Sequence, residues 1–553
     1  MNGEKIFKDP VYGYVSIKSE FITKFIDTPC FQRLRHIIQT SYSPVYAAAL
    51  HNRFSHSLGV YHLGEIVYKQ IKSFMNNSKN KFNPDGKSIE WINNHEDIFL
   101  AACLLHDIGH APFSHTGEIF YETIKNFYDF VYDTVGTHGN NCNFKEEINK
   151  KSTSKANPHE CMSVLIALET FKDYFNKIEP EDREFFSRCI LGYKYTDVKL
   201  EITQVKNCII ELLNSELIDV DKLDYIIRDA FTSGYQNVSI DYNRLLRGMV
   251  IVYDQNEVVL AYHKNAQSVI ENVIYAHDCE RKWIQNHPVI LYENFLLEHC
   301  IRKVNDCFED EEKTHSLFST ASLTAEGNTL KLHSGSESVD LNISLLSDID
   351  ILFFIKNMPS CRDLLTKEYF DRNSRRHPLW KSEGEYKFFL ENMAPKNKNK
   401  INAVFYTIDQ FFAQFADIEK HVLPIINDES LKFADKKGNE FKICKTFFEI
   451  LKSFSTDQEI PFDFVLIPAK GFQSNFSKEI EIDNIKVWYP YDEDSTKMAG
   501  KPDLSFIAKK KNDKECYYYL YIKRNDKRKV EFSKIIQLLD DLAEKYTELS
   551  RPK

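Results

Sequence analysis

The apolar segment AACLL, residues 101–105, runs directly into His106 and Asp107. Such a segment predicts a helix that is buried among other helices, so the imidazole and the carboxylate that follow it enter the protein interior. Burying these groups is costly unless each finds a partner. A hydrogen-bonded pair would satisfy them, and so would a divalent cation. The segment therefore requires either a polar pair or a metal site inside a helical core.

Two further segments favour the metal. HNRFSHSLGV, residues 51–60, contains Arg53 and His56, and IDVDKLDYIIRD, residues 218–229, contains Asp221. Imidazoles and carboxylates from separate helices of a bundle form mixed nitrogen and oxygen sites for Mn, Fe, Zn or Mg. The sequence therefore predicts a divalent metal site.

The 218–229 segment also predicts a helical face rich in polar groups. A turn of about 100° per residue places Asp221, Tyr225 and Asp229 on one face. Lys222 lies one step around the helix and offers a cation for a phosphate. Asp219 is better explained as the N-cap of this helix than as a ligand.

The first half of the chain predicts a succession of helices, and we interpret residues 1–310 as a mainly α core. Thr28 and Pro29 suit the N-cap and N1 positions of a helix whose apolar stripe reaches Ile38. The polar stretch 133–158 lacks periodicity and is expected to be a loop or mobile insertion. Further helices are expected at 55–74, 95–107, 159–175, 202–214 and 221–231.

Residues 311–553 are expected to form a smaller mixed α/β lobe that serves assembly or regulation. Before it, residues 248–263 alternate like a hairpin, and 264–306 are helical with Pro288 as a kink. Within the lobe, strands are expected at 462–469, 503–510 and 515–524, followed by a closing amphipathic helix at 531–549.

Composition limits the partners. The net charge of −10 argues against a surface built to neutralise nucleic-acid phosphates. The sequence has neither a signal-peptide pattern nor an apolar window long enough to span a bilayer, so we expect a cytoplasmic protein. The 12 cysteines are scattered without a CxxC pair, which fits reduced thiols. Histidines and carboxylates must therefore bind any metal.

The ligand pattern resembles a known family. His56, the pair His106 and Asp107, and Asp221 match the H…HD…D set of the HD-domain metal-dependent phosphohydrolases. The longer strings resemble the deoxynucleoside triphosphate (dNTP) triphosphohydrolases, which include bacterial dGTPases and the mammalian SAM-and-HD-domain protein. The strings are IDTPCFQRLRHI, HNRFSHSLGV, HDIGHAPFSH and IDVDKLDYIIRD.

This resemblance implies hydrolysis at the α-phosphorus of a dNTP, which gives a deoxynucleoside and triphosphate. It implies a metal held by His56, His106, Asp107 and Asp221, with additional Mg on the nucleotide. The catalytic residues would be His110, Glu118 and His159 on the water side, and His115 as the proton donor to the 5′ oxygen. The substrate contacts would be Gln39, Arg53, Lys222, Tyr225, Asp229 and His287.

The resemblance also implies regulation by an activating nucleotide in a homo-oligomer, a dimer or a tetramer. The matching activator-site positions are Lys5, Asp27, Gln32, Arg35 and Arg244. The sequence departs from related bacterial enzymes at His277, where an arginine is usual, and at Gln285, where a tyrosine is usual.

Four alternatives remain open from the sequence. Arg53 could be a structural ion pair, and residues 27–35 could simply start a helix and pair charges. The substrate could be another nucleotide, so that the chain is an HD nucleotidase or phosphodiesterase. The chain could also be a nucleotide sensor without catalysis.

Overall fold

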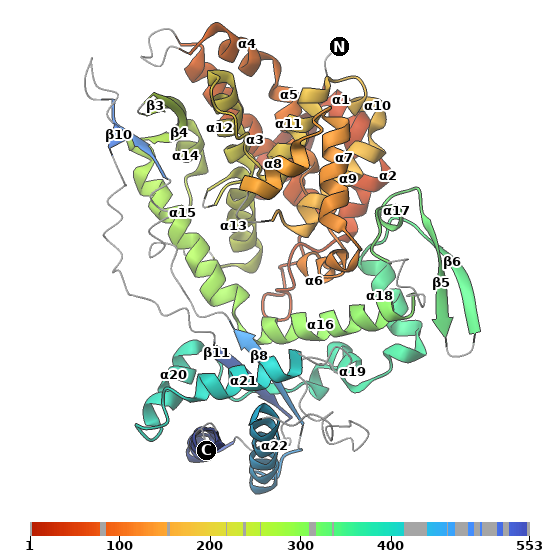
Figure 1. Cartoon of the computed structure of the whole chain (residues 1–553), viewed down its shortest axis with the longest axis vertical. Coiled ribbons are helices and arrows are strands. Elements are labelled where there is room, and N and C mark those ends of the chain that lie inside the picture. Colours follow the sequence, from red (N-terminus) through yellow and green to blue (C-terminus); the bar gives the residue numbers. More distant parts are fainter. Residues whose placement is uncertain are drawn as a thin grey trace. The chain divides into compact units, whose positions relative to one another are not determined.

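The computed structural model describes residues 3–77, 84–151, 155–216, 218–235, 239–254, 256–308, 317–334, 337–413, 439–461, 463–469, 485–490, 498–499, 517–523 and 530–549. It is mainly α with a few small sheets, as the sequence predicted (Figure 1). No helix within these described ranges is both long and apolar enough to cross a bilayer.

The chain forms two compact units, and neither is continuous in sequence. Unit 1 contains Met1–Glu280, Ile301–Cys361 and Ser474–Lys510, and unit 2 contains Arg281–Cys300, Arg362–Gln473 and Lys511–Lys553. This division does not follow the predicted boundary at residue 310, because residues 301–361 belong to the same unit as the N-terminal part of the chain. The roles expected for 1–310 and 311–553 stay predictions.

Unit 1 is a helical bundle edged by small sheets. Its longer helices are α3 (Arg53–Met75), α4 (Gly86–Asn94), α5 (Glu96–Leu105), α7 (Phe127–His138), α8 (Phe144–Lys151), α9 (Pro158–Thr170), α11 (Pro180–Leu191), α12 (Glu201–Leu213), α13 (Val220–Ser233), α15 (Gln267–Cys279) and α18 (Asp348–Asn357). Its short helices include α1 (Ser19–Phe21), α2 (Pro29–Gln32), α6 (His115–Glu118), α10 (Lys172–Phe175), α14 (Tyr242–Arg247) and α17 (Thr320–Leu323).

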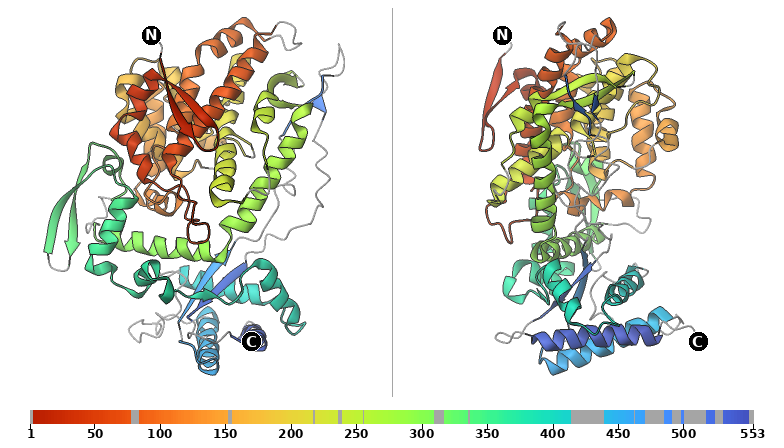
Figure 2. Two further views of the ribbon diagram at one scale, coloured as in Figure 1. Left: turned by 180° about the vertical axis from the view of Figure 1, so that it is seen from behind. Right: turned by 90° about the vertical axis from the view of Figure 1, so that its left-hand side faces the viewer.

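The strands of unit 1 lie in three separate sheets. β1 (Glu4–Asp9) and β2 (Gly13–Lys18) form an N-terminal hairpin on the outside of the bundle (Figure 2). β3 (Met249–Asp254) and β4 (Glu257–His263) form the predicted hairpin, which β9 (Val487–Trp488) and β10 (Met498–Ala499) extend in the order β10-β9-β4-β3. β5 (Asn328–Ser334) pairs with β6 (Glu337–Ile343).

Unit 2 combines helices with a three-stranded antiparallel sheet. The sheet order is β7 (His377–Pro378), β11 (Tyr517–Ile522) and β8 (Phe464–Ala469). Its helices are α19 (Leu364–Phe370), α20 (Glu383–Asn392), α21 (Ile401–Ala413), α22 (Asn439–Asp457) and α24 (Phe532–Leu549). Helix α16 (Pro288–Asp306) starts in unit 2 and ends in unit 1. The strands and closing helix predicted near β8, β11 and α24 are confirmed, whereas 503–510 lie outside the described residues.

The prediction of a loop over 133–158 is wrong for much of its length. Helix α7 continues to His138, because Val131 and Val135 continue its buried stripe. Helix α8 follows at Phe144–Lys151 despite its polar sequence. Its Glu147 Oε2 lies 2.7 Å from Arg188 Nη2. This tertiary ion pair and the burial of Phe144 stabilise a helix that local apolar periodicity does not indicate.

The helix predicted from Thr28 begins correctly and ends early. The Thr28 side chain accepts a hydrogen bond from the backbone N–H of Phe31, and Pro29 is at N1. After α2 the chain tightens into a 3₁₀ turn, Arg33–His36, and Ile37 is extended. The backbone N–H of Arg53 donates to the Ile37 carbonyl, so this backbone bonds with residues outside the predicted helix.

Candidate metal centre and proton-transfer cluster

Three helices of unit 1 bring the predicted metal ligands together. Helix α3 packs against α5 and α13. His56 lies in the first turn of α3, and His106 and Asp107 follow the end of α5, whose residues from Phe99 to Leu105 are fully buried. Asp221 lies in the first turn of α13, which Asp219 caps by accepting from the Lys222 backbone N–H, as predicted.

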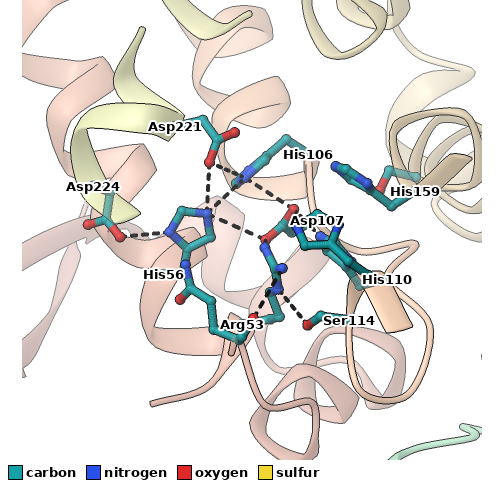
Figure 3. Close-up of polar contacts among 12 residues, drawn as sticks. Arg53, His56, His106, Asp107, His110, Ser114, His159, Asp221 and Asp224 are labelled. Carbon is teal, nitrogen blue, oxygen red and sulfur yellow. Dashed lines mark hydrogen bonds and ion pairs between the residues drawn. The ribbon is translucent and has the colours of Figure 1, made fainter. Parts of the chain in front are cut away.

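The ligand atoms converge on one point (Figure 3). The Nε2 atoms of His56 and His106 are 3.3 Å apart. Asp221 Oδ1 lies 2.9 Å from the first and 3.5 Å from the second. Asp107 places Oδ2 3.5 Å from His56 Nε2 and Oδ1 3.3 Å from His106 Nε2.

These residues fit a divalent cation. Two nitrogen ligands on one tetrahedral ion, each at about 2.0–2.1 Å, are separated by about 3.3 Å. The His56–His106 separation matches this value. His56 Nδ1 lies 2.7 Å from Asp224 Oδ2, and His106 Nδ1 lies 2.9 Å from the Cys103 carbonyl oxygen. Because both Nδ1 atoms can donate to these acceptors, the Nε2 lone pairs would be available to bind a cation.

The carboxylates of the centre are ionised. Burial raises the pKa of Asp221, but His106 and His56 outweigh that effect and hold it well below its usual range. Burial likewise raises the pKa of Asp107, and Arg53, His106 and His110 together bring it well below its usual range. One buried carboxylate, Asp107, and one partly exposed carboxylate, Asp221, lie beside two imidazoles. This site has the charge and donor types that suit a divalent metal.

A buried charge network supports His56 from behind. Arg228 donates from Nε to Asp224 Oδ2 at 2.9 Å and from Nη1 to Asp9 Oδ2 at 2.9 Å. Tyr12 donates its hydroxyl to Asp224 Oδ1 at 2.8 Å. Gly59 permits this close packing, because a Cβ there would lie 1.9 Å from Asp224 Oδ1. The network fixes Asp224 and therefore the His56 ring.

Arg53 is engaged inside the centre. Its Nη1 donates to Asp107 Oδ2 at 2.8 Å, and its Nε donates to Ser114 Oγ at 3.0 Å. Its side chain is 6% exposed, so the structural ion pair considered from the sequence is present. Arg53 therefore joins a metal ligand to the loop that leads to His115.

A second cluster adjoins the first and is centred on Glu118. Glu118 Oε2 lies 2.9 Å from His159 Nδ1 and 3.3 Å from His115 Nδ1, and Oε1 contacts His110 Nδ1. The rings of His110 and His159 stack with centroids 4.2 Å apart at 12°. Because the rings are stacked, their Nδ1 atoms point in parallel directions. The His110 Nδ1 atom meets Oε1 of Glu118, and the His159 Nδ1 atom meets Oε2. This arrangement can orient proton carriers, and the same four residues also have donor atoms close enough together to hold an ion.

The two stacked imidazoles have opposite electrostatic environments. Burial, together with Arg53, lowers the pKa of His110 to about 4. Burial also lowers the pKa of His159, but Glu118 outweighs it and raises that pKa to about 9. The opposite shifts favour the neutral form of His110 and the imidazolium form of His159. Groups whose pKa values are pushed apart in this way are typical of general acid–base sites.

The clusters are connected through His110, whose Nε2 lies 3.0 Å from Asp107 Oδ1. His115 is the exposed member of the set, with 70% of its side chain accessible. Gly109 lets the connecting turn approach α9, since a Cβ there would lie 2.3 Å from the Ser163 backbone nitrogen. The predicted catalytic residues thus lie together beside the metal ligands.

The residues expected to contact the substrate have different neighbours in the structure. Lys222 Nζ donates to Asp219 Oδ2 at 2.6 Å, and Asp229 Oδ1 lies 2.7 Å from His51 Nε2. The Gln39 side chain is buried, and the Tyr225 ring centroid is 6.3 Å from that of His277. His287 belongs to unit 2, so its predicted contact with the substrate stays a prediction.

Four of the expected activator-site residues lie close together. Lys5 Nζ and Asp27 Oδ1 are 3.3 Å apart. Gln32 accepts at 2.8 Å from Arg35 Nε and donates at 2.7 Å to the Ile26 carbonyl oxygen. The guanidinium of Arg35 covers the Phe54 ring at 3.5 Å. Arg244 lies apart from these contacts in α14, and a nucleotide role for all five stays a prediction.

Sequence reasoning assigned no role to several residues of the centre. Asp224 and Arg228 had a local signal, because carboxylate and guanidinium four residues apart on a helix form a pair. His51, Tyr12 and Asp9 had none, since their partners are distant in sequence.

The donor set and the fold are those of a protein with an HD domain and a candidate divalent metal centre. The HD-domain pattern matches residues 53–155. That range contains His56, His106 and Asp107, and Asp221 lies beyond it.

Comparison with characterised relatives supports the resemblance to the dNTP triphosphohydrolases. The chain is 25% identical to deoxynucleoside triphosphate triphosphohydrolase SAMHD1 of Gallus gallus, over 71% of this chain and 58% of that protein. It is 28% identical to the SAMHD1 homolog of Dictyostelium discoideum, over 56% of this chain and 52% of that protein.

Two further similarities carry less functional information. The chain is 28% identical to the uncharacterized protein YwfO of Bacillus subtilis, over 56% of this chain and 58% of that protein. A crystal structure of a hypothetical protein from Aquifex aeolicus shares the fold, with a TM-score of 0.53, 18% identity and coverage of 99% and 100% of the two chains. The chain spans little more than half the length of the curated relatives compared here.

Proposed function

We propose that this protein hydrolyses dNTPs to deoxynucleosides and inorganic triphosphate. The observation that carries the proposal is the contact between His110 and Asp107, which joins a metal centre to a cluster of oriented imidazoles. The similarity to SAMHD1 proteins supports the choice of a dNTP over other phosphate esters.

In the proposed reaction, water attacks the α-phosphorus and the bond between phosphorus and the 5′ oxygen breaks. The oxygen of water stays on the triphosphate, and the 5′ oxygen leaves with a proton on the deoxynucleoside. His56, His106, Asp107 and Asp221 would hold a divalent cation, which would supply Lewis-acid polarisation of the phosphoryl oxygen and a lowered pKa for water. Magnesium on the nucleotide would offset further phosphate charge.

The residues of the second cluster divide the proton transfers. Glu118 orients His110 and His159, and neutral His110 accepts the proton released by the attacking water. His115 lies on the exposed side and donates to the departing 5′ oxygen. Arg53 and Lys222 neutralise phosphate charge, whereas Gln39, Tyr225, Asp229 and His287 contact the sugar and the rest of the nucleotide.

Regulation and assembly belong to the same proposal. An activating nucleotide would bind at Lys5, Asp27, Gln32 and Arg35, with Arg244 in a second activator position, and promote a dimer or tetramer. A cytoplasmic enzyme of this kind would lower dNTP pools and could limit replication of invading DNA.

The test is a panel of all dNTPs and NTPs, singly and in pairs, with the full chain and Mn²⁺. Chromatography separates triphosphate from phosphate and pyrophosphate. We expect triphosphate and nucleoside from at least one dNTP, and none from His106→Ala or Asp107→Ala. Release of phosphate or pyrophosphate alone would favour an HD nucleotidase or phosphodiesterase. Nucleotide binding without turnover would favour a sensor.

A further inference from the structure

The loop that carries His115 has an unusual backbone. Phe113 and Ser114, consecutive non-glycine residues, have φ values of 59° and 53°. Positive φ is uncommon for such residues and persists only where the surrounding structure enforces it. The next residue, His115, begins α6, which also carries Glu118. The strained turn therefore sets the direction of two members of the proton-transfer cluster.

A carboxylate from far along the chain holds this turn. Asp348 Oδ1 accepts from the backbone N–H of Phe113 at 2.6 Å, across 235 residues of sequence. Its other oxygen, Oδ2, accepts from the backbone N–H of Ile38 at 2.8 Å. Asp348 is 8% exposed. One buried carboxylate thus uses both oxygens to join the Phe113–Ser114 turn to the backbone at Ile38, next to Gln39.

Ser114 closes the same connection from the other side. Its hydroxyl donates to the Ile38 carbonyl at 2.6 Å and accepts from Arg53 Nε at 3.0 Å. The Ile38 peptide groups are therefore bonded to Asp348 and to Ser114. Since Arg53 also pairs with the metal ligand Asp107, the turn is tied to the metal centre.

The two hydrogen bonds that Asp348 accepts, from the N–H groups of Phe113 and Ile38, are called the clamp below. Residues just before Asp348 reinforce it. Buried Arg33 donates from Nη1 to the Leu346 carbonyl at 2.9 Å, and from Nη2 to the carbonyls of Ile108 and His110 at 2.8 and 2.9 Å. The Leu346 backbone N–H donates to the Ser322 carbonyl at 2.9 Å, which anchors this segment to α17. Between His106 and His115 the backbone is therefore held at two places. The Arg33 guanidinium binds its first part, and the Asp348 carboxylate binds its second part at Phe113.

We propose that Asp348 is a positioning residue that holds the Phe113–Ser114 turn so that His115 and Glu118 face the reacting phosphate ester. The inference rests on the proposed function for its kinetic consequence. Its structural content, that Asp348 restrains the turn, is independent of the substrate.

The test compares Asp348→Asn with the matched control Asp350→Asn. An asparagine at 348 has only one acceptor oxygen. Its NH₂ group would face one of the two backbone N–H donors, so that one of the two hydrogen bonds is lost. Asp350 lies two residues away and caps α18 through Oδ2 alone, which accepts from the Ser347 N–H and hydroxyl. Asparagine can keep those bonds with its carbonyl oxygen. The control thus has the same chemical change on the same helix without losing the clamp.

We expect Asp348→Asn to lower kcat by about 10–100-fold, because small misplacements of catalytic groups carry costs of that order. KM should stay within about threefold, since proton donation acts in the transition state. Hydrogen exchange should be faster for amides of residues 109–118, and bound Mn²⁺ should be unchanged. Asp350→Asn should match the wild type in every measurement.

Unchanged exchange of 109–118 in Asp348→Asn would overturn the proposal, and so would equal effects of the two substitutions. If Asp348→Asn does not fold, Asp348→Glu replaces it, because it keeps the charge but cannot place both oxygens on the same two amides. Wild-type kinetics and exchange for Asp348→Glu would then be the overturning result. If the wild type hydrolyses no nucleotide, the proposed function fails while the exchange comparison still decides the role of Asp348.

Discussion

Asp224→Asn should weaken metal binding although Asp224 is not a ligand. Asp224 Oδ2 lies 2.7 Å from His56 Nδ1, and both side chains are almost fully buried. Asparagine can still accept this hydrogen bond, but it removes the negative charge that makes the His56 ring a stronger donor to a cation.

The magnitude follows from the two roles of Asp224. Loss of an outer-shell partner typically lowers metal affinity by about 10–100-fold, or about 1.4–2.7 kcal/mol. Removing one partner of a buried ion pair costs about 3–5 kcal/mol of folding stability. Because Arg228 keeps its bond to Asp9, we expect the lower end, about 3 kcal/mol.

The assay titrates metal-free full-length protein with Mn²⁺ and follows free Mn²⁺ by electron paramagnetic resonance. Urea unfolding with and without Mn²⁺ measures stability. Asp9→Asn is the matched control, because it removes a negative charge paired with the same Arg228 without touching His56. We expect it to lower stability while leaving Mn²⁺ affinity within about threefold of the wild type.

Two results would refute this reasoning. Wild-type Mn²⁺ affinity in a folded Asp224→Asn protein would mean that Asp224 does not act through His56. Equal loss of affinity in Asp9→Asn would mean that general stability, and not the bond to His56, controls metal binding.

Three other substitutions test separate parts of the centre. Glu118→Gln should lower kcat by about 10²–10⁴-fold with bound Mn²⁺ retained; loss of the metal would instead make Glu118 a ligand. The pKa of His159, about 9, is above its ordinary value, so its proton is held below that pH and lost above it. The rate should fall above about pH 9, and His159→Gln should lack this limb of the pH–rate profile. Gly59→Ala should cost about 1–3 kcal/mol in urea unfolding and weaken Mn²⁺ binding, because its Cβ would displace Asp224. Gly86→Ala, which meets nothing within 4 Å, is its control.

The sequence predicted the parts of this site that are encoded locally. Apolar spacing indicated α3, α5 and α13, and the polar residues at their ends indicated a metal centre. The capping role of Asp219 was also readable, because it depends on the start of one helix.

What the sequence did not predict depends on partners that are distant along the chain. Helix α8 is stabilised by Arg188, and His56 is oriented through a network that reaches Asp9. The role of Asp348 had no local signal, because its two N–H donors come from two loops that only the folded chain brings together.

The position of Asp348 also has a consequence for synthesis on the ribosome. When His115 has just been added to the nascent chain, Asp348, whose carboxylate holds the Phe113–Ser114 turn, has not yet been made. Asp348 follows Phe113 by 235 residues. At about 5–20 residues per second, the missing stretch takes on the order of 10–50 s to make. His56, His106 and Asp107 are synthesised before this interval begins. Asp221 is synthesised during it, and still before Asp348. All four predicted metal ligands are therefore synthesised before the residue that holds the proton-transfer turn.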